Sequence, residues 1–294
     1  MGEPSATARR MNHAATRYLE AKRSIDDRAL APRIRDRLLA HLPAEPRIRE
    51  AGCGTGATVP RLHAWGIDSG SYCGVDRDQE AISFARHVRP AAFRHAGHDI
   101  VDTDRGFRVD DLAVTFETGD ALTAFDENSA DLFVAQAFAD LVPLAELVAT
   151  LESVLDPGGV AYLPITFDGG TVFQPDHPRD DAIERAYHRA IDRRPGRDVT
   201  AGRHLADLLR ERSGDLLAMA SSDWIVRPRT SGYPADERYF VGCILGFIDE
   251  LLSDADEHVD GLEEWLTTRR QQLSDGELTY VAHQYDLLYR PATP

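Results

Sequence analysis

A glycine-rich turn between Glu50 and Gly56, with the sequence EAGCGTG, has the composition of a ligand-binding loop. It follows a predicted short strand, residues 47–50, and precedes a helical pattern that carries Val59 and Leu62 on one face. Glycine has no side chain, so such a turn lets a ligand approach the backbone N–H groups at the start of the helix. The turn therefore predicts a nucleotide-type ligand without identifying it.

Two acidic residues follow the next two predicted strands. The first strand, residues 71–76, ends in Asp76, which lies 20 residues past Gly56. At that distance a carboxylate can accept hydrogen bonds from ribose hydroxyls. The second strand, residues 112–117, runs into Thr118-Gly119-Asp120-Ala121. The glycines and Asp76 also fit the fingerprint of dinucleotide-binding proteins, so they leave two families open.

These segments together resemble the class I S-adenosylmethionine-dependent methyltransferases, whose first motif has the form E/D-x-G-x-G-x-G. In that family an acid after the third strand contacts the adenine, a position where dinucleotide enzymes have no standard need for one. The string VLDPGGVAYLPITF, residues 154–167, is very like the helix, turn and strand that follow the active-site strand of the family. The resemblance covers residues 45 to 167 strongly and the last predicted strand weakly.

The resemblance implies an α/β fold, a Rossmann-like sheet of seven strands with an N-terminal helical lid and helical cap insertions. We expect the lid at residues 1–46, with helices at 11–22 and 28–42, and the methyltransferase domain at residues 47–294. The remaining strands are expected at 130–136, 160–167, 216–226 and 278–289, the last entering antiparallel beside the fifth. Cap insertions are expected at about 168–200 and 228–277. Residues 90–111 and 168–180 are predicted to be loops.

The cofactor implied by the resemblance is S-adenosylmethionine. The residues expected to bind it are Tyr18, Lys22, Glu50, Gly52, Gly54, Gly56, Asp76, Arg77, Asp120, Ala121 and Gln136. Lys22 is the only lysine of the chain. It is either a lid cation that meets the methionine carboxylate of the cofactor or an exposed helix residue.

The general base is not identified by any motif. Asp140 follows the fourth strand, where it is either a base or the N-cap of the next helix. His177 and His283 are further candidates, although a lone histidine is more often structural. The N/D-P-P-Y motif of many nucleic-acid and glutamine methyltransferases is absent from this position. His87, His95, His98 and Asp99 have no standard metal-ligand spacing, so no metal is expected.

The composition is acidic and halophile-like. The formal net charge is -16, about two-thirds of the acids are aspartate, and nearly all basic residues are arginine. Either a GC-rich genome or a high-salt cytoplasm produces this pattern, and the aspartate excess favours the second. Without a basic patch we expect no nucleic-acid partner. Without an apolar membrane span or signal region, or disulfide spacing among Cys53, Cys73 and Cys243, we expect a cytoplasmic protein with no membrane partner.

The expected function is methylation of a small molecule at oxygen or nitrogen by in-line displacement. The expected pocket has aromatic walls, from Phe167, Phe173, Tyr233, Tyr239 and Phe240. Two alternatives stay open. One is an NAD-dependent oxidoreductase, although Tyr-x-x-x-Lys occurs only at residues 18–22, ahead of the glycine turn. The other is a non-catalytic binding module of the same fold.

Overall fold

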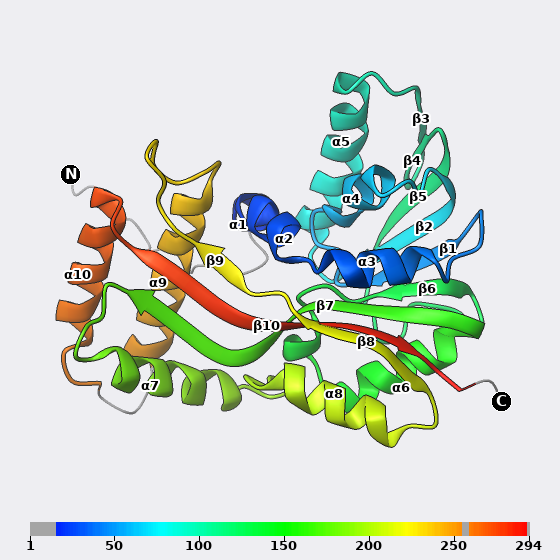
Figure 1. Cartoon of the computed structure of the whole chain (residues 1–294). Helices are drawn as coiled ribbons and strands as arrows, with labels where there is room; N and C mark the ends of the chain where they lie inside the picture. The colour runs from blue at the N-terminus through cyan, green and yellow to red at the C-terminus, as the bar shows by residue number, and fades with distance from the viewer. Residues whose placement is uncertain (1–15, 255–258, 293–294) are drawn as a thin grey trace, which may run out of the picture.

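A ten-stranded sheet forms the centre of the protein in a computed structural model that describes residues 16–254 and 259–292 (Figure 1). The strands are β1 (Arg47–Ala51), β2 (Ser69–Asp76), β3 (Ile100–Thr103), β4 (Gly106–Val109), β5 (Asp111–Thr118), β6 (Ala130–Val134), β7 (Leu155–Gln174), β8 (Asp215–Ser221), β9 (Trp224–Val226) and β10 (Thr279–Arg290). Their order across the sheet is β3-β4-β5-β2-β1-β6-β7-β10-β8, and β9 pairs with β10.

The core of this sheet is parallel, as in the Rossmann-like fold that the resemblance implies. Strands β5, β2, β1, β6 and β7 pair in parallel. Strand β10 is antiparallel to β7 and to β8, so the last strand enters beside the fifth as expected. The α/β fold class is confirmed. Because parallel strands end at one edge, their carboxyl ends can carry a common ligand site.

Ten α-helices and a 3₁₀ helix belong to the described residues. They are α1 (Thr16–Ala21), α2 (Arg23–Ala29), α3 (Pro32–Leu39), α4 (Thr58–Ala64), α5 (Gln79–His95), η1 (Ala139–Leu141), α6 (Leu144–Val154), α7 (Asp180–Asp192), α8 (Ala201–Glu211), α9 (Glu237–Ser253) and α10 (Leu262–Asp275). Helices α3 to α5 cover one face of the sheet, and α6 and α8 cover the other (Figure 1). Helices α7, α9 and α10 gather around the far ends of β7 and β10.

The N-terminal helices differ from the prediction. The pattern from 28 to 42 is divided into α2 and α3, because Pro32 starts a new helix at its first position and cannot continue the one before it. The first expected helix is present as α1 from Thr16 onward. Residues 11–15 of that prediction lie outside the described residues.

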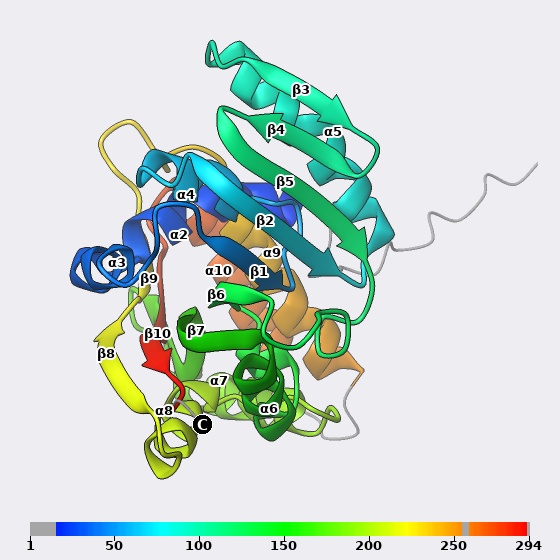
Figure 2. The same cartoon turned by 90° about the vertical axis from the view of Figure 1, so that its right-hand side faces the viewer.

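Two predictions of loops are wrong. Residues 100–109 form the antiparallel hairpin β3–β4, which extends the sheet beyond β5 (Figure 2). Strand β7 continues through residues 168–174, where glycine suggested a turn. Gly170 lies opposite His283 of β10, and a Cβ on it would approach the His283 Cβ to 2.8 Å, so close strand pairing explains the glycine. The expected strand 216–226 is divided into β8 and β9.

Candidate active site

The glycine turn joins β1 to α4 in a conformation that needs glycine. Gly52 and Gly56 have φ of 68° and 70°, a region that other residues rarely adopt. A Cβ on Gly56 would lie 2.6 Å from the ring of Phe116. The backbone N–H groups of Gly52 and Cys53 donate to the Val75 carbonyl oxygen at the end of β2, at 2.9 and 3.1 Å. The turn is thereby held against the carboxyl end of the sheet.

A first cavity lies between this turn and the N-terminal helices. Five of the predicted cofactor residues line it: Lys22, Glu50, Gly52, Gly54 and Gln136. Asp26 of α2, which the sequence analysis did not single out, lines it as well. The Lys22 ammonium is 3.6 Å from Asp26 Oδ2. An ammonium beside a carboxylate complements the zwitterionic end of an amino acid, so these residues fit the methionine part of S-adenosylmethionine.

Asp26 is held by donors from two further elements. Its Oδ1 accepts from Trp224 Nε1 at 2.9 Å and its Oδ2 from Gln136 Nε2 at 3.0 Å. Arg61 donates in turn to Gln136 Oε1. Burial raises the pKa of Asp26, and the nearby Lys22 and Arg61 partly oppose the rise. The network fixes Gln136 and Asp26 at the cavity wall.

Glu50 lies below the turn and supports it. Its carboxyl accepts from Thr58 Oγ1 at the start of α4, at 2.7 Å, and from the Tyr72 hydroxyl on β2. Burial raises the pKa of Glu50 to about 7. It therefore connects three elements around the turn, in keeping with an orienting role.

Asp76 and Asp120 lie at the ends of β2 and β5 and do not line the first cavity. Asp76 Oδ2 accepts from the Gly54 N–H at 2.8 Å, so this carboxylate also shapes the turn. Asp120 pairs with Arg77 at 2.6 Å, and this hydrogen bond lowers the pKa of Asp120. Ala121, next to it, is buried. Both acids project from the same sheet edge as the turn, as a site for ribose and adenine requires.

A second cavity of about 180 Å³ adjoins the first. Leu19 and Lys22 line both. The walls of the second come from α1, η1, β7, α7, α9, β9 and β10. Its aromatic residues are Tyr18, Phe167, Tyr187, Trp224 and Tyr280. Of the five predicted aromatic residues only Phe167 lines it; Phe173, for example, packs against Trp265 at a centroid distance of 5.2 Å.

Asp140 lines the second cavity, and its interpretation as a helix cap is wrong. It lies in η1, whereas α6 begins at Leu144 with Pro143 as its N-cap. Its carboxyl makes no ion pair and no hydrogen bond to another residue of the described chain. Burial raises the pKa of Asp140, and Arg197 and Lys22 partly oppose the rise. A partly buried, unpaired carboxyl in a cavity is able to accept a proton from a ligand.

Comparisons with known proteins point the same way. Residues 49–163 match a family model described as a methyltransferase domain. This part of the chain is a class I S-adenosylmethionine-dependent methyltransferase domain. No curated protein matches the chain significantly. The protein is thus an enzyme that uses S-adenosylmethionine.

Solved structures are similar to the chain at low sequence identity. A putative methyltransferase from Bacillus halodurans is 14% identical, with a TM-score of 0.52, and 86% of this chain and 95% of that chain are covered. A methyltransferase from Thiobacillus denitrificans, in complex with S-adenosyl-L-homocysteine, is 17% identical, with 90% and 92% covered and a TM-score of 0.47. Geranyl diphosphate C-methyltransferase from Streptomyces coelicolor is 15% identical, with 89% and 77% covered and a TM-score of 0.45.

The two histidines predicted as possible bases lie outside both cavities of the methyltransferase. His177 precedes α7, and its Nδ1 accepts from the Arg179 N–H at 3.2 Å. His283 is on β10, where Ala282 and Gln284 face the second cavity, so its side chain lies on the opposite face. Its Nδ1 is 2.8 Å from Asp223 Oδ1. Neither placement suits a base for a ligand in these cavities.

Sequence reasoning missed several residues of the second cavity. Gln284 is buried, and its Nε2 has no hydrogen-bond partner among the described residues. Arg197, between α7 and α8, lines the same cavity, and burial lowers its pKa. Tyr18 also belongs here rather than to the first cavity, stacked on Phe240 at 5.5 Å. The alternation along β10 places Gln284 on the same face as Ala282, but only the fold shows which face lines the cavity.

No helix of the described residues is long and apolar enough to cross a membrane.

Proposed function

We propose that this methyltransferase acts on a small molecule at oxygen or nitrogen, with Asp140 as the general base. The observation that carries the proposal is the unpaired Asp140 carboxyl in the second cavity, directly beside the cavity of the glycine turn. Leu19 and Lys22 border both spaces, so ligands in the two cavities would lie next to each other. That arrangement suits transfer of a group from one ligand to the other.

The cofactor would be held along the carboxyl edge of the sheet. Lys22 would bind the methionine carboxylate and Asp26 the methionine ammonium, while Asp76 would accept from the ribose and Asp120 from the adenine amine. The bound cofactor supplies a methyl group that its sulfonium already activates. The protein has to orient the acceptor and exclude water, and α1 to α3 would do so as a lid over residues 47–294.

The substrate class follows from the walls of the second cavity. They come from α1, α7 and α9 as well as the sheet, and walls on several sides suit a small molecule better than a macromolecule. Ile165, Ile244 and Leu251 make much of the lining apolar. The Gln284 Nε2 without a partner and the Arg197 guanidinium would donate to a polar group of the substrate. We therefore propose an apolar small molecule with one acceptor group besides its nucleophile.

Asp140 would act on the proton of the nucleophile. A hydroxyl or ammonium group must lose a proton as its oxygen or nitrogen gains the methyl group, and the Asp140 carboxylate would take it. The raised pKa makes this carboxylate a stronger base than an exposed one. The rate should rise with pH as Asp140 ionises, above the ordinary aspartate pKa of about 3.9.

The test measures cofactor binding and transfer separately. Calorimetry in high salt should detect binding of S-adenosylhomocysteine and no binding of NAD. Transfer of a deuterated methyl group to a panel of small apolar phenols, alcohols and amines would be followed by mass spectrometry. Asp140→Asn should lower the transfer rate by roughly 10² to 10⁴, the usual contribution of a general base. It should leave S-adenosylhomocysteine affinity nearly unchanged.

His177→Ala is the matched control, because His177 lines neither cavity, and it should retain the wild-type rate. Failure to bind S-adenosylhomocysteine would contradict the assignment of the cofactor residues. Transfer that persists in Asp140→Asn would remove Asp140 as the base. Methylation of carbon, or of a protein or nucleic acid in place of the panel, would refute the proposed substrate class.

A further inference from the structure

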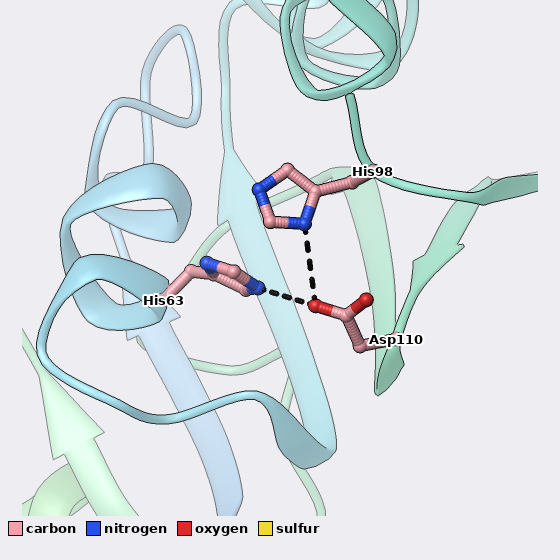
Figure 3. Close-up of side chains that lie close together, drawn as sticks. All are labelled: His63, His98 and Asp110. Carbon is pink, nitrogen blue, oxygen red and sulfur yellow. Dashed lines mark hydrogen bonds and ion pairs between the residues drawn. The ribbon is translucent and has the colours of Figure 1, made fainter. Parts of the chain in front are cut away.

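Three metal-ligating side chains meet at a place that the methylation site does not use. His63 lies in α4, His98 in the connection between α5 and β3, and Asp110 in the turn between β4 and β5. Figure 3 shows both imidazoles directed at one carboxylate oxygen of Asp110. None of the three lines either cavity of the site described above. In the sequence they are too far apart to form a standard spacing, which is why none was predicted to bind a metal.

The distances are close to those of a coordination sphere. His63 Nε2 is 2.7 Å and His98 Nδ1 is 3.4 Å from Asp110 Oδ2. The three ligand atoms all lie within 4.8 Å of one another. Ligands at about 2.0–2.1 Å from a tetrahedral zinc ion are about 3.3 Å apart. Of the three pairs, His98–Asp110 already has about this separation, and His63–Asp110 reaches it when its hydrogen bond lengthens by about 0.6 Å. The two histidine nitrogens lie within 4.8 Å of each other and would move closer on binding.

The rings are held in place by their neighbours. Phe93 of α5 packs against His63 at a centroid distance of 5.1 Å and against His98 at 5.5 Å. The His98 N–H donates to the Phe93 carbonyl oxygen at 3.1 Å. Asp110 has a left-handed backbone with φ of 50°, and the next N–H, of Asp111, donates to the Asp68 carbonyl oxygen at 3.0 Å. The backbone of three elements therefore sets the geometry of the cluster.

The chemistry of the cluster selects a class of ion. Two imidazole nitrogens and one carboxylate oxygen suit zinc and its neighbours, whereas magnesium and calcium prefer oxygen ligands alone. The side chains are 15%, 32% and 42% exposed, which leaves room for water as a fourth ligand.

We propose that His63, His98 and Asp110 form a binding site for a divalent transition-metal ion, zinc by preference. The ion would join α4, the end of α5 and the β4–β5 turn, and would stabilise the edge of the sheet at β3 and β4. Because none of the three residues lines either cavity, the role would be structural rather than catalytic. The alternative is a hydrogen-bonded His–Asp–His cluster that binds no ion.

The test uses untagged full-length protein freed of metal by chelation. Zn²⁺ would be titrated by calorimetry and Co²⁺ by its visible absorption, which reports a low-symmetry nitrogen and oxygen site. Wild type should bind one equivalent, and its melting temperature should rise with Zn²⁺. His63→Ala, His98→Ala and Asp110→Asn should each weaken binding by roughly tenfold or more and abolish that rise.

Two controls separate lost ligands from lost folding. His95→Ala changes an exposed histidine of α5 outside the cluster and should bind Zn²⁺ like wild type. Asparagine tolerates left-handed backbone, so Asp110→Asn should melt like metal-free wild type and still bind S-adenosylhomocysteine. Absence of Zn²⁺ and Co²⁺ binding to wild type would overturn the proposal. Binding that survives in all three variants, or falls equally in His95→Ala, would place any ion elsewhere and overturn it as well.

Discussion

Lys22 occupies the boundary between the two cavities. Its ammonium is 3.6 Å from Asp26 Oδ2 and lies 5.6 Å from the centroid of the Trp224 ring. The side chain is 13% exposed, so a carboxylate that meets it there is largely shielded from water. In a chain that otherwise uses arginine, a compact ammonium at this place suggests a space that a planar guanidinium fits poorly.

We predict that Lys22→Ala weakens S-adenosylhomocysteine binding by about 1–3 kcal/mol, the range for a hydrogen bond to a charged group. Lys22→Arg should recover only part of this loss. Methylthioadenosine lacks the methionine carboxylate, so its affinity should respond to neither substitution. Calorimetry with both ligands on each variant measures the difference.

The neighbouring Arg23 provides the matched control, since it lines neither cavity and pairs with Glu20 at 3.2 Å. Arg23→Ala should leave both affinities unchanged. Equal weakening of both ligands by Lys22→Ala would indicate a lid that has lost its fold. No weakening of either would make Lys22 an ordinary helix residue.

At this scale the sequence predicts residues whose role is set locally. The glycine turn and Asp76 are legible because their chemistry depends on a few neighbours along the chain. The role of Asp140 stayed ambiguous because the sequence does not show at which residue α6 begins. Pro143 is the N-cap of α6, so Asp140 is not. The sequence placed His283 on the correct strand, but Gln284, on the opposite face of that strand, lines the cavity. No local pattern shows which face of a strand is enclosed.

Asp286 connects two elements, β10 of the sheet and α3 of the N-terminal segment. Its Oδ2 accepts from the Ala31 N–H, at the start of α3, at 2.9 Å, and from the Tyr162 hydroxyl on β7 at 3.4 Å. Its Oδ1 is buried without a partner among the described residues. Burial raises the pKa of Asp286 from 3.8 to about 7. The folded state is therefore more stable when the Asp286 carboxyl is protonated than when it is ionised.

This contact predicts a pH dependence of stability. As the pH rises from about 4 to about 7, Asp286 ionises in the unfolded chain before it does so in the folded one, so the fold loses stability. Asparagine keeps an oxygen for the Ala31 N–H and does not ionise. The stability of Asp286→Asn relative to wild type should thus increase across this range, by up to about 1.4 kcal/mol per pH unit, and level off above it.

Urea unfolding of both proteins at pH 4 to 8 measures this difference directly. Subtraction removes the contributions of all other ionisable groups, which the two proteins share. A difference that does not change with pH would mean that Asp286 has the same pKa in the folded and unfolded states, and a decrease would mean that its pKa is lower in the folded state.

Whole elements were predictable where hydrophobic periodicity was strong. The helical patterns at residues 181–192, 202–212, 235–252 and 259–273 agree with α7, α8, α9 and α10 to within a few residues. The β3–β4 hairpin was missed because each strand has only four residues, too few for a period to mark them, and β3 is largely exposed. The second half of β7 was missed because Gly169 and Gly170 signalled a turn. Both errors arise where pairing with a distant strand, rather than local propensity, sets the conformation.

At the scale of the whole molecule, the protein has many more acidic residues than basic residues to pair with them. Many arginines pair with acids at the surface, as Arg94 does with Asp102 at 2.5 Å and Arg105 with Glu117 at 2.9 Å. Exposed ion pairs of this kind contribute little to the free energy of unfolding, about 0–1 kcal/mol each. A net charge of -16 remains, and its self-repulsion opposes the compact state.

The melting temperature should therefore rise as KCl increases from dilute to molar concentration, because the screening length falls from about 10 Å at 0.1 M to about 3 Å at 1 M. Calorimetric melting at a series of KCl concentrations measures this, with sucrose of equal osmolality as the control for general exclusion of solutes. Screening predicts a steep rise in KCl that sucrose does not reproduce. An equal rise in both would assign the effect to solute exclusion. A flat or falling KCl curve would leave codon bias as the better explanation of an acidic chain with a single lysine, since repulsion among its carboxylates would then be too weak for salt to relieve.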